Sequence, residues 1–275
     1  MVAAEGSVLH ILPEGNNVYG VTALDNLLYV LRQQLSEHIE VYDTQSYHLK
    51  RCLKVQGLRT KADITSCAHN CCLYISGHTD KCVHRVALPN VDVTKWPVND
   101  VSGCLSVTET HSVLVSCYEV RKIKEFTTHG NLLRQLELPQ DVMTPCHAVQ
   151  LSSGEFITCH GRTGDSLHRV CVVRSNGQVV KSYGGTRGAR NHQMDSPTHL
   201  AVDRNGFVFV VDRNNCRVLL LSPELTSVPK IVSQDRLQWK PQRLFLDSDR
   251  RRLYIAENQW QQSEFSAGRV VVISI

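Results

Sequence analysis

The sequence predicts an all-β fold, a six-bladed β-propeller of four-stranded antiparallel blades whose ring is closed by the N-terminal strand. Three observations support this prediction. A unit of about 40 residues, the length of one propeller blade, recurs along the chain. Each unit contains short apolar strands separated by turn residues. The last unit lacks one strand, which the N-terminus can supply.

The clearest repeat unit spans residues 197–232. The apolar runs LAV and FVFVV flank the turn Asp203–Gly206, and Asn-Gly between two strands is a strong hairpin signal. Gly206 ends this turn, where a positive φ is expected. A second turn over Asp212–Cys216 leads into RVLLL, and a third near Pro223 leads into a fourth strand. This unit therefore contains the four strands of one blade.

Two further positions repeat in register with these strands. The second strand of each unit is marked by Tyr29, Tyr74, Leu114, Phe156, Phe209 and Tyr254. The start of each third strand is marked by His38, Arg85, Lys122, Arg169, Arg217 and Arg269. One longer interval between markers is explained by the polar insertion GGTRGARNHQM. The markers predict a single propeller domain over residues 1–275, with blades near 18–58, 61–100, 101–141, 143–185, 194–237 and 239–275 plus 7–13.

The final unit stops after its third strand, at Ile275, and its blade would lack an outer strand. Residues Val8–Leu12 are apolar and have no other place in the repeat. An outer strand from the opposite terminus would remove an open sheet edge, and open edges promote aggregation. We therefore expect Val8–Leu12 to be the outermost strand of the blade that contains Val270–Ile273.

At this point the sequence resembles a known family. PTHLAVDRNGFVFVVDRNNCRVLLLS is similar to the NHL repeat, in which an Asp-x-x-Gly hairpin precedes Val-Asp, Asn and Arg. The matching residues here are Asp203, Gly206, Val211, Asp212, Asn215 and Arg217. The chain is similar by spacing to the C-terminal propeller of tripartite-motif (TRIM) NHL proteins. That resemblance implies a binding propeller, with RNA as one ligand class and substrate recognition for a ubiquitin ligase as another role. The RING, B-box and coiled-coil parts of that family have no counterpart in this sequence, and ligase activity is not carried over.

Composition places the chain among soluble globular proteins, with 42% hydrophobic and 20% charged residues. The 11 cysteines are odd in number and form no CxxC pairs, which predicts reduced cytosolic thiols. A zinc site from Cys67 and Cys71 lacks a second ligand pair. The chain has no apolar run of about 20 residues for a membrane helix. The first residues carry Glu5 and no basic region, unlike a signal peptide. We expect a cytoplasmic protein without membrane association.

Residues that could carry out catalysis are few. The sequence contains no GxSxG elbow, no phosphate-binding GxxxxGK[ST] loop and no HExxH. His147 and His199 lie near the starts of innermost strands in neighbouring blades, and these strands point at the central channel, so the two side chains are expected to approach each other. Some propeller lyases and lactonases bind metal at that position. Asp63 and Asp100 are the only nearby acidic partners, too few for a zinc or calcium site. We expect no catalysis, metal or cofactor, with a metal-dependent lyase or hydrolase as the less favoured alternative.

The expected binding surface is the top face, where loops between second and third strands meet the loops that join blades. The basic residues chosen as its contacts are Arg59, Lys61, Lys122, Arg187, Arg190 and Arg213; Arg121 and Arg162 are assigned to the same face. Arg187 and Arg190 lie in TRGARNH, whose flanking glycines predict a flexible basic loop that binds an anionic surface. A solvated loop without a partner is the open alternative, because acidic residues lie near the same face.

The net charge of +4 falls short of a typical nucleic-acid-binding domain. We therefore expect a protein partner, with RNA as the alternative, and a monomeric ring. Arg217 invites a functional interpretation because its position recurs, but a structural one is stronger. Asp212 stands five residues earlier across a turn. A bidentate Asp212–Arg217 pair would hold that turn in place.

Overall fold

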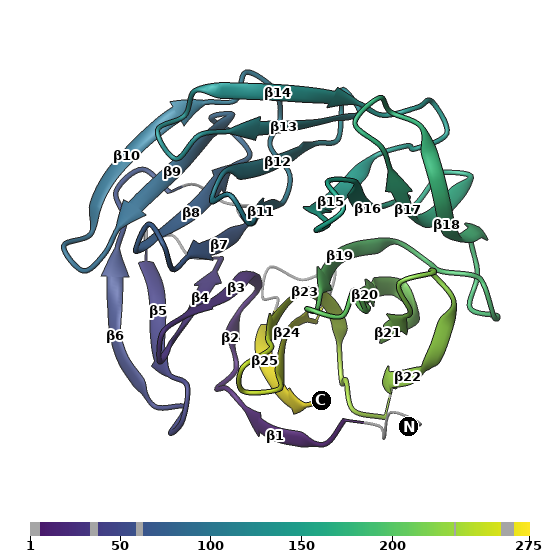
Figure 1. The fold of residues 1–275 in the computed structure, drawn as a ribbon. Coiled ribbons are helices and arrows are strands. Elements are labelled where there is room, and N and C mark those ends of the chain that lie inside the picture. The colour runs from purple at the N-terminus through teal and green to yellow at the C-terminus, as the bar shows by residue number, and fades with distance from the viewer. Residues whose placement is uncertain (1–5, 34–37, 59–62, 234, 260–266) are drawn as a thin grey trace.

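The strands form six antiparallel sheets that stand in a ring around a central channel (Figure 1). The computed structural model describes residues 6–33, 38–58, 63–233, 235–259 and 267–275. Within those ranges the only helical segment is the short 3-10 turn Arg213–Asn215. No helix in the described ranges is long and apolar enough to cross a membrane. The predicted all-β, six-bladed fold is confirmed.

The first three blades follow one another along the chain. Blade 1 consists of β3 (Val18–Leu24), β4 (Leu27–Arg32), β5 (His38–Asp43) and β6 (Leu49–Lys54). Blade 2 consists of β7 (Ile64–Cys67), β8 (Cys72–Gly77), β9 (Cys82–Ala87) and β10 (Asp92–Pro97). Blade 3 consists of β11 (Leu105–Val107), β12 (Val113–Cys117), β13 (Lys122–Phe126) and β14 (Leu132–Glu137).

The last three blades complete the ring. Blade 4 consists of β15 (Pro145–Gln150), β16 (Phe156–His160), β17 (Leu167–Val173) and β18 (Val179–Thr186). Blade 5 consists of β19 (Pro197–Val202), β20 (Val208–Asp212), β21 (Arg217–Leu221) and β22 (Ser227–Val232). Blade 6 consists of β23 (Lys240–Asp247), β24 (Arg252–Asn258), β25 (Ala267–Ser274) and, from the other terminus, β1 (Val8–Ile11).

The N-terminal strand closes the ring as the sequence predicts. β1 runs antiparallel to β25 along the outside of blade 6, with Val8 opposite Ile273 and Ile11 opposite Val271 (Figure 1). The backbone N–H of Leu12 continues the ladder to the carbonyl of Val270 at 2.9 Å. A second short strand, β2 (Gly15–Asn16), also pairs with β25. The two termini therefore share one sheet.

The core is distributed over the interfaces between blades. Six clusters of buried apolar side chains occur, one between each pair of neighbouring blades, including blades 6 and 1. The marker residues predicted for the second strands are all buried in those strands. Strands buried on both faces explain the continuous apolar runs that the repeat displays.

One of the third-strand markers was placed wrongly. Arg217 and Arg269 lie opposite Asp212 and Glu257 at the end of the preceding strand. Arg85 instead lies in the middle of β9, opposite Tyr74. The position that corresponds to Arg217 in blade 2 belongs to Cys82. The third-strand markers were chosen by their basic character alone. The register of a strand is instead set by its hydrophobic pattern and by the geometry of its turns.

The turn at Gly206 has the predicted conformation. Gly206 has a φ of +82°. Its N–H donates to the carbonyl of Asp203 at 3.0 Å, and the Asp203 carboxylate accepts from the N–H of Asn205 and of Phe207. A side chain here would be strained, because L-residues rarely adopt this φ.

All 11 cysteines are free thiols. Eight of them are buried, while Cys52 and Cys71 are exposed and Cys216 is half-buried. Buried thiols pack as small apolar side chains. Most of the cysteines therefore lie in the core, while their reduced state stays a prediction.

Candidate functional site

Six residues at one equivalent position in the innermost strands form a layer across the channel. In this layer Gly20, His147, His199 and Arg243 each follow a bulge and lie opposite the second strand of their blade. In blades 2 and 3 the same position is taken by Asp63 and Cys104, whose carbonyls accept from Ser76 and Ser116. The repeat therefore brings residues from all six blades to the channel axis.

Asp63 is the buried acid of this layer. Its Oδ1 accepts from Arg243 Nε at 2.9 Å, and its Oδ2 accepts from the backbone N–H of Leu105 at 2.9 Å. Nε2 of His199 lies 3.8 Å from Oδ2. Burial alone would raise the pKa of Asp63, but the Arg243 charge and the His199 contact hold it below its usual value. The carboxylate is therefore ionised and paired.

The two inner histidines meet as expected, with ring centroids 3.8 Å apart. His147 Nε2 donates to the carbonyl of Leu105 at 3.0 Å, and its Nδ1 accepts from the N–H of Leu200 at 3.4 Å. Burial lowers the pKa of both His147 and His199. Both rings are therefore neutral, and His147 has a structural role.

Asp100 does not join this layer, contrary to the expectation that it lies near the inner histidines. Its carboxylate forms an ion pair with Lys124 at 2.6 Å. The two residues come from the loop before β11 and from β13. Their pairing follows from blade packing, which spacing along the chain does not reveal.

Asp63, Cys104 and His199 bring three potential metal-binding atoms within 4.8 Å of one another. These atoms suit a cation poorly, because both Asp63 oxygens already accept hydrogen bonds and one donor is the cationic Arg243. The layer is therefore better described as a polar floor of the channel.

A pocket of about 530 Å³ lies above this layer at the mouth of the channel. Three arginines line it: Arg162, Arg213 and Arg243. Among the described residues that line it, Asp63 is the only acidic one, and it is already paired with Arg243. The volume is in the usual range for a ligand site of about 300–1,000 Å³. The pocket therefore carries a net positive charge.

Tyr118 supports one side of this mouth. Its ring stacks on His78 with centroids 5.8 Å apart, and the guanidinium of Arg162 lies 4.1 Å over the same ring.

The pKa of Arg213 is lowered by burial and then by the positive charge of Arg243. Like charges gathered in a partly buried pocket favour the binding of an anion, which relieves their repulsion.

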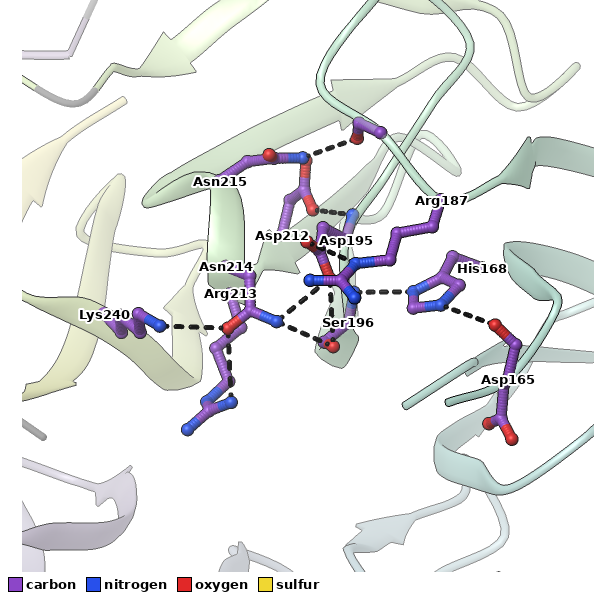
Figure 2. A network of polar contacts seen from close by, with 11 residues as sticks. Asp165, His168, Arg187, Asp195, Ser196, Asp212, Arg213, Asn214, Asn215 and Lys240 are labelled. Carbon is purple, nitrogen blue, oxygen red and sulfur yellow. Dashed lines mark hydrogen bonds and ion pairs between the residues drawn. The ribbon is translucent and has the colours of Figure 1, made fainter. Parts of the chain in front are cut away.

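A network of hydrogen bonds holds the blade 5 loop that carries Arg213 (Figure 2). Asp195 is its centre and accepts from Arg187 Nε at 2.8 Å and from Asn214 Nδ2 at 2.9 Å. Asp195 also donates its N–H to Asp212 Oδ1 at 2.7 Å. Burial would raise the pKa of Asp195, but the Asn214 and Arg187 contacts lower it. The loop is therefore fixed in place by charged groups.

Arg217 pairs with Asp212 but not in the bidentate manner expected. Only its Nε contacts Asp212 Oδ2, at 2.6 Å. Its Nη1 and Nη2 donate to the carbonyls of Ala189 and Gln193 in the insertion, at 3.2 and 2.9 Å. A nearly buried guanidinium thus holds the insertion at two backbone carbonyls, and the flexibility of the loop stays a prediction.

The structure separates the predicted binding residues. Arg213 lines the pocket, while Arg187 and Arg190 are exposed on the insertion beside it. Lys122 begins β13 and forms an ion pair with Glu137 at 3.1 Å, outside the pocket lining. Arg59 and Lys61 lie outside the described residues.

Sequence reasoning missed three residues of the mouth: His78, Tyr118 and Arg243. His78 and Tyr118 each directly follow a second strand, as Arg213 does. Arg243 occupies the same inner position as His147 and His199. Aligning the units by strand register would have located all three, because equivalent positions face the same part of the channel.

Comparison with known proteins identifies the fold only. No family model and no curated protein sequence matches the chain. Virginiamycin B lyase from Staphylococcus aureus matches with a TM-score of 0.65 and 8% identity over 96% of this chain and 99% of the lyase. A streptogramin B lyase matches at 0.62 and 10% identity, covering 98% and 97%. Hydrazine synthase from Kuenenia stuttgartiensis matches at 0.64 and 12% identity, covering 90% and 94%.

Proposed function

We propose that this propeller is a non-enzymatic binding module whose channel mouth receives an acidic segment of a protein partner. The observation that carries this proposal is the convergence of Arg162, Arg213 and Arg243 on one pocket, whose described lining residues include a single carboxylate that is already paired. Arginine side chains suit carboxylates because two parallel N–H groups can meet both oxygens. A rigid ring holds these groups in place, which lowers the entropy lost on binding.

Two features favour a protein partner over RNA. The net charge of the whole chain is only +4, too low for a surface that follows a long phosphate backbone. RNA-binding sheets and single-strand binders stack bases on available aromatic rings. Two tyrosines line the mouth: the Tyr118 ring is already in contact with His78 and Arg162, and Tyr19 donates its hydroxyl to Gln33. The resemblance to TRIM-NHL propellers is the reason that RNA stays the alternative.

The likeness to lyases does not decide for catalysis. The two lyases are 8% and 10% identical to this chain in sequence. Their likeness therefore supports the ring and says nothing about its chemistry. The polar floor of this channel places the Arg243 cation against Asp63, a carboxylate of the pocket. Binding of an anion requires only the three arginines and no catalytic group. Anion binding is therefore the simpler explanation of their convergence on the pocket.

A pair of matched double variants tests the proposal. Arg162→Gln with Arg213→Gln removes two charges from the mouth, and Lys122→Gln with Arg190→Gln removes two charges from positions outside the pocket lining. The probes are a labelled glutamate-rich peptide and single-stranded oligouridine, each titrated at several salt concentrations. We expect the mouth variant to weaken peptide binding by at least tenfold, because charged hydrogen bonds contribute about 1.5–3 kcal/mol each. The control variant should change it by less than about threefold.

Other results would change the conclusion. Equal losses in the two double variants would mean that overall charge, and not the mouth, attracts the peptide. Binding of oligouridine without binding of the peptide would replace the protein partner by RNA. A peptide affinity unaffected by the mouth substitutions would overturn the proposal.

A further inference from the structure

Blade 2 departs from the repeat at the start of its third strand. In blades 5 and 6 this position is Arg217 or Arg269, each paired with an acidic residue across the sheet. In blade 2 the residues that face each other there are Gly77 and Cys82. Two small residues replace a charged pair, which leaves room at the top of the blade.

Asp80 fills this room. Its carboxylate folds back over Gly77, and a Cβ at residue 77 would overlap the carboxylate. Cys82 Sγ donates to Asp80 Oδ2 at 2.9 Å. His84 lies two residues along β9, hence on the same sheet face, and its Nε2 is 3.2 Å from Cys82 Sγ and 3.3 Å from Asp80 Oδ2. One sulfur, one nitrogen and one oxygen therefore face a common point.

The spacing of these atoms is close to that of a tetrahedral zinc centre. Zinc lies about 2.3 Å from thiolate sulfur and about 2.0–2.2 Å from imidazole nitrogen or carboxylate oxygen, which puts neighbouring ligand atoms about 3.4–3.6 Å apart. The three separations here are 2.9, 3.2 and 3.3 Å. An outward shift of a few tenths of an ångström would admit the ion. Thiolate and imidazole select zinc over calcium or magnesium, which prefer oxygen ligands.

The surroundings differ from those of Asp63 in the channel. Cys82 and His84 are buried, at 5% and 2% exposure, while Asp80 lies at the surface and gives access from solvent. Among the described residues no lysine or arginine lies within ion-pair distance of the Asp80 carboxylate. No cation therefore competes with a metal for this carboxylate.

We propose that Asp80, Cys82 and His84 bind a zinc ion, with the fourth position open to water or to a group from a partner. On binding, the Cys82 thiol releases its proton to solvent and its sulfur forms the bond to zinc, with no change of oxidation state. His84 binds through Nε2 as the neutral ring, and Asp80 through one carboxylate oxygen. The site uses none of the arginines of the mouth, and zinc binding can fail while acidic-peptide binding holds.

The test uses the full chain incubated with zinc and then dialysed against metal-free buffer. We expect about one zinc per chain by elemental analysis. The cobalt-loaded protein should show a thiolate-to-cobalt charge-transfer band. Cys82→Ser should abolish that band and lower zinc affinity by at least tenfold. Cys171→Ser is the matched control, because Cys171 lies 3.6 Å from His160 Nε2 but has Arg169, not a carboxylate, beside that ring.

Asp80→Asn provides a second variant at the surface, in case Cys82→Ser does not fold. It should weaken zinc binding by at least tenfold while the circular dichroism spectrum stays unchanged. Zinc content and cobalt spectra that are the same in wild type, Cys82→Ser and Asp80→Asn would overturn the proposal. Loss of zinc in Cys171→Ser but not in Cys82→Ser would overturn it as well, as would a wild-type chain that retains no zinc.

Discussion

Asp63 and Arg243 meet at the channel axis although 180 residues separate them along the chain. A buried ion pair is retained only where each member is also hydrogen-bonded, because both charges lose their hydration. Asp63 has the backbone of Leu105 as a second donor, and Arg243 Nη1 donates to the carbonyl of Gln242 at 3.0 Å. Single residues at equivalent repeat positions thus differ in chemistry, and this difference gives the channel mouth its charge.

Gly206 occupies a turn position that glycine adopts without strain. We expect Gly206→Val to lower the free energy of unfolding by about 1–3 kcal/mol, because its φ of +82° strains any L-residue. A Cβ at this position would also lie 3.3 Å from the Pro223 ring. Urea unfolding monitored by circular dichroism measures the change.

Gly185→Val is the matched control for Gly206→Val. A Cβ at Gly185 would have no atom within 4 Å, and Gly185 does not have a positive φ. Its loss of stability should be clearly smaller. Equal losses in the two variants would show that the φ of Gly206 is not the cause.

Strand β1 does not pair with a strand next to it in the sequence. It pairs with a strand near the other end of the chain, and its outer edge faces solvent. Leu12 anchors the segment, since its side chain is 1% exposed and packs between blades 6 and 1. The insertion before blade 5 is held in a comparable way by Arg217. Elements outside the regular repeat are therefore fixed by a few buried residues.

Leu12→Ala tests the closure of the ring. We expect a loss of about 2–5 kcal/mol in the free energy of unfolding, the usual effect of removing a buried leucine. Leu9→Ala is the control, because Leu9 is on the same strand segment but 47% exposed. Deletion of residues 1–13 should destabilise more than either substitution. An unchanged melting temperature in the deletion would contradict the role of β1.

Across the whole molecule, stability comes from six similar interfaces. Each blade packs on both neighbours, and the interface between blades 6 and 1 has the same apolar character as the other five. Buried histidines lie in blades 2, 4 and 5, among them His84, His147, His160 and His199. Because burial disfavours the charged ring, these residues link the stability of the whole ring to pH.

We expect the ring to lose stability as the pH falls from about 6.5 to about 4. Burial, followed by the charge of Arg169, lowers the pKa of His160 to about 4. The unfolded chain takes up a proton near pH 6.5, which the folded chain does not bind until about pH 4. His160 alone would contribute about 3 kcal/mol to this loss. Between pH 6.5 and about pH 5 the effect lies above the range in which carboxylates titrate in the unfolded chain.

Urea unfolding at pH 7, 6 and 5 measures this dependence. His160→Gln keeps an acceptor for Arg169 and should flatten the dependence, because glutamine takes up no proton. If the wild type and His160→Gln lost equal stability between pH 7 and pH 5, His160 would not be a source of the effect.

The sequence by itself determined the ring. The features that predicted it are local or repeated, and each depends on backbone structure. They are the strand periodicity, the Asp203–Gly206 hairpin and the last repeat unit, which has three strands of its own. They predicted six blades, closure by β1 and the turn at Gly206. The approach of His147 to His199 also followed from equivalent positions in neighbouring units.

Only the tertiary structure decided which side chains meet. Arg213 joins Arg162 and Arg243 at the mouth, and Arg217 reaches the insertion, because the ring brings distant segments into contact. Arg85 was misplaced because a basic residue next to an apolar run does not fix the register. Asp80, Cys82 and His84 meet because Gly77 leaves space that no repeat pattern records. Strand patterns depend on nearest neighbours in sequence, whereas sites depend on side-chain directions set by packing across the ring.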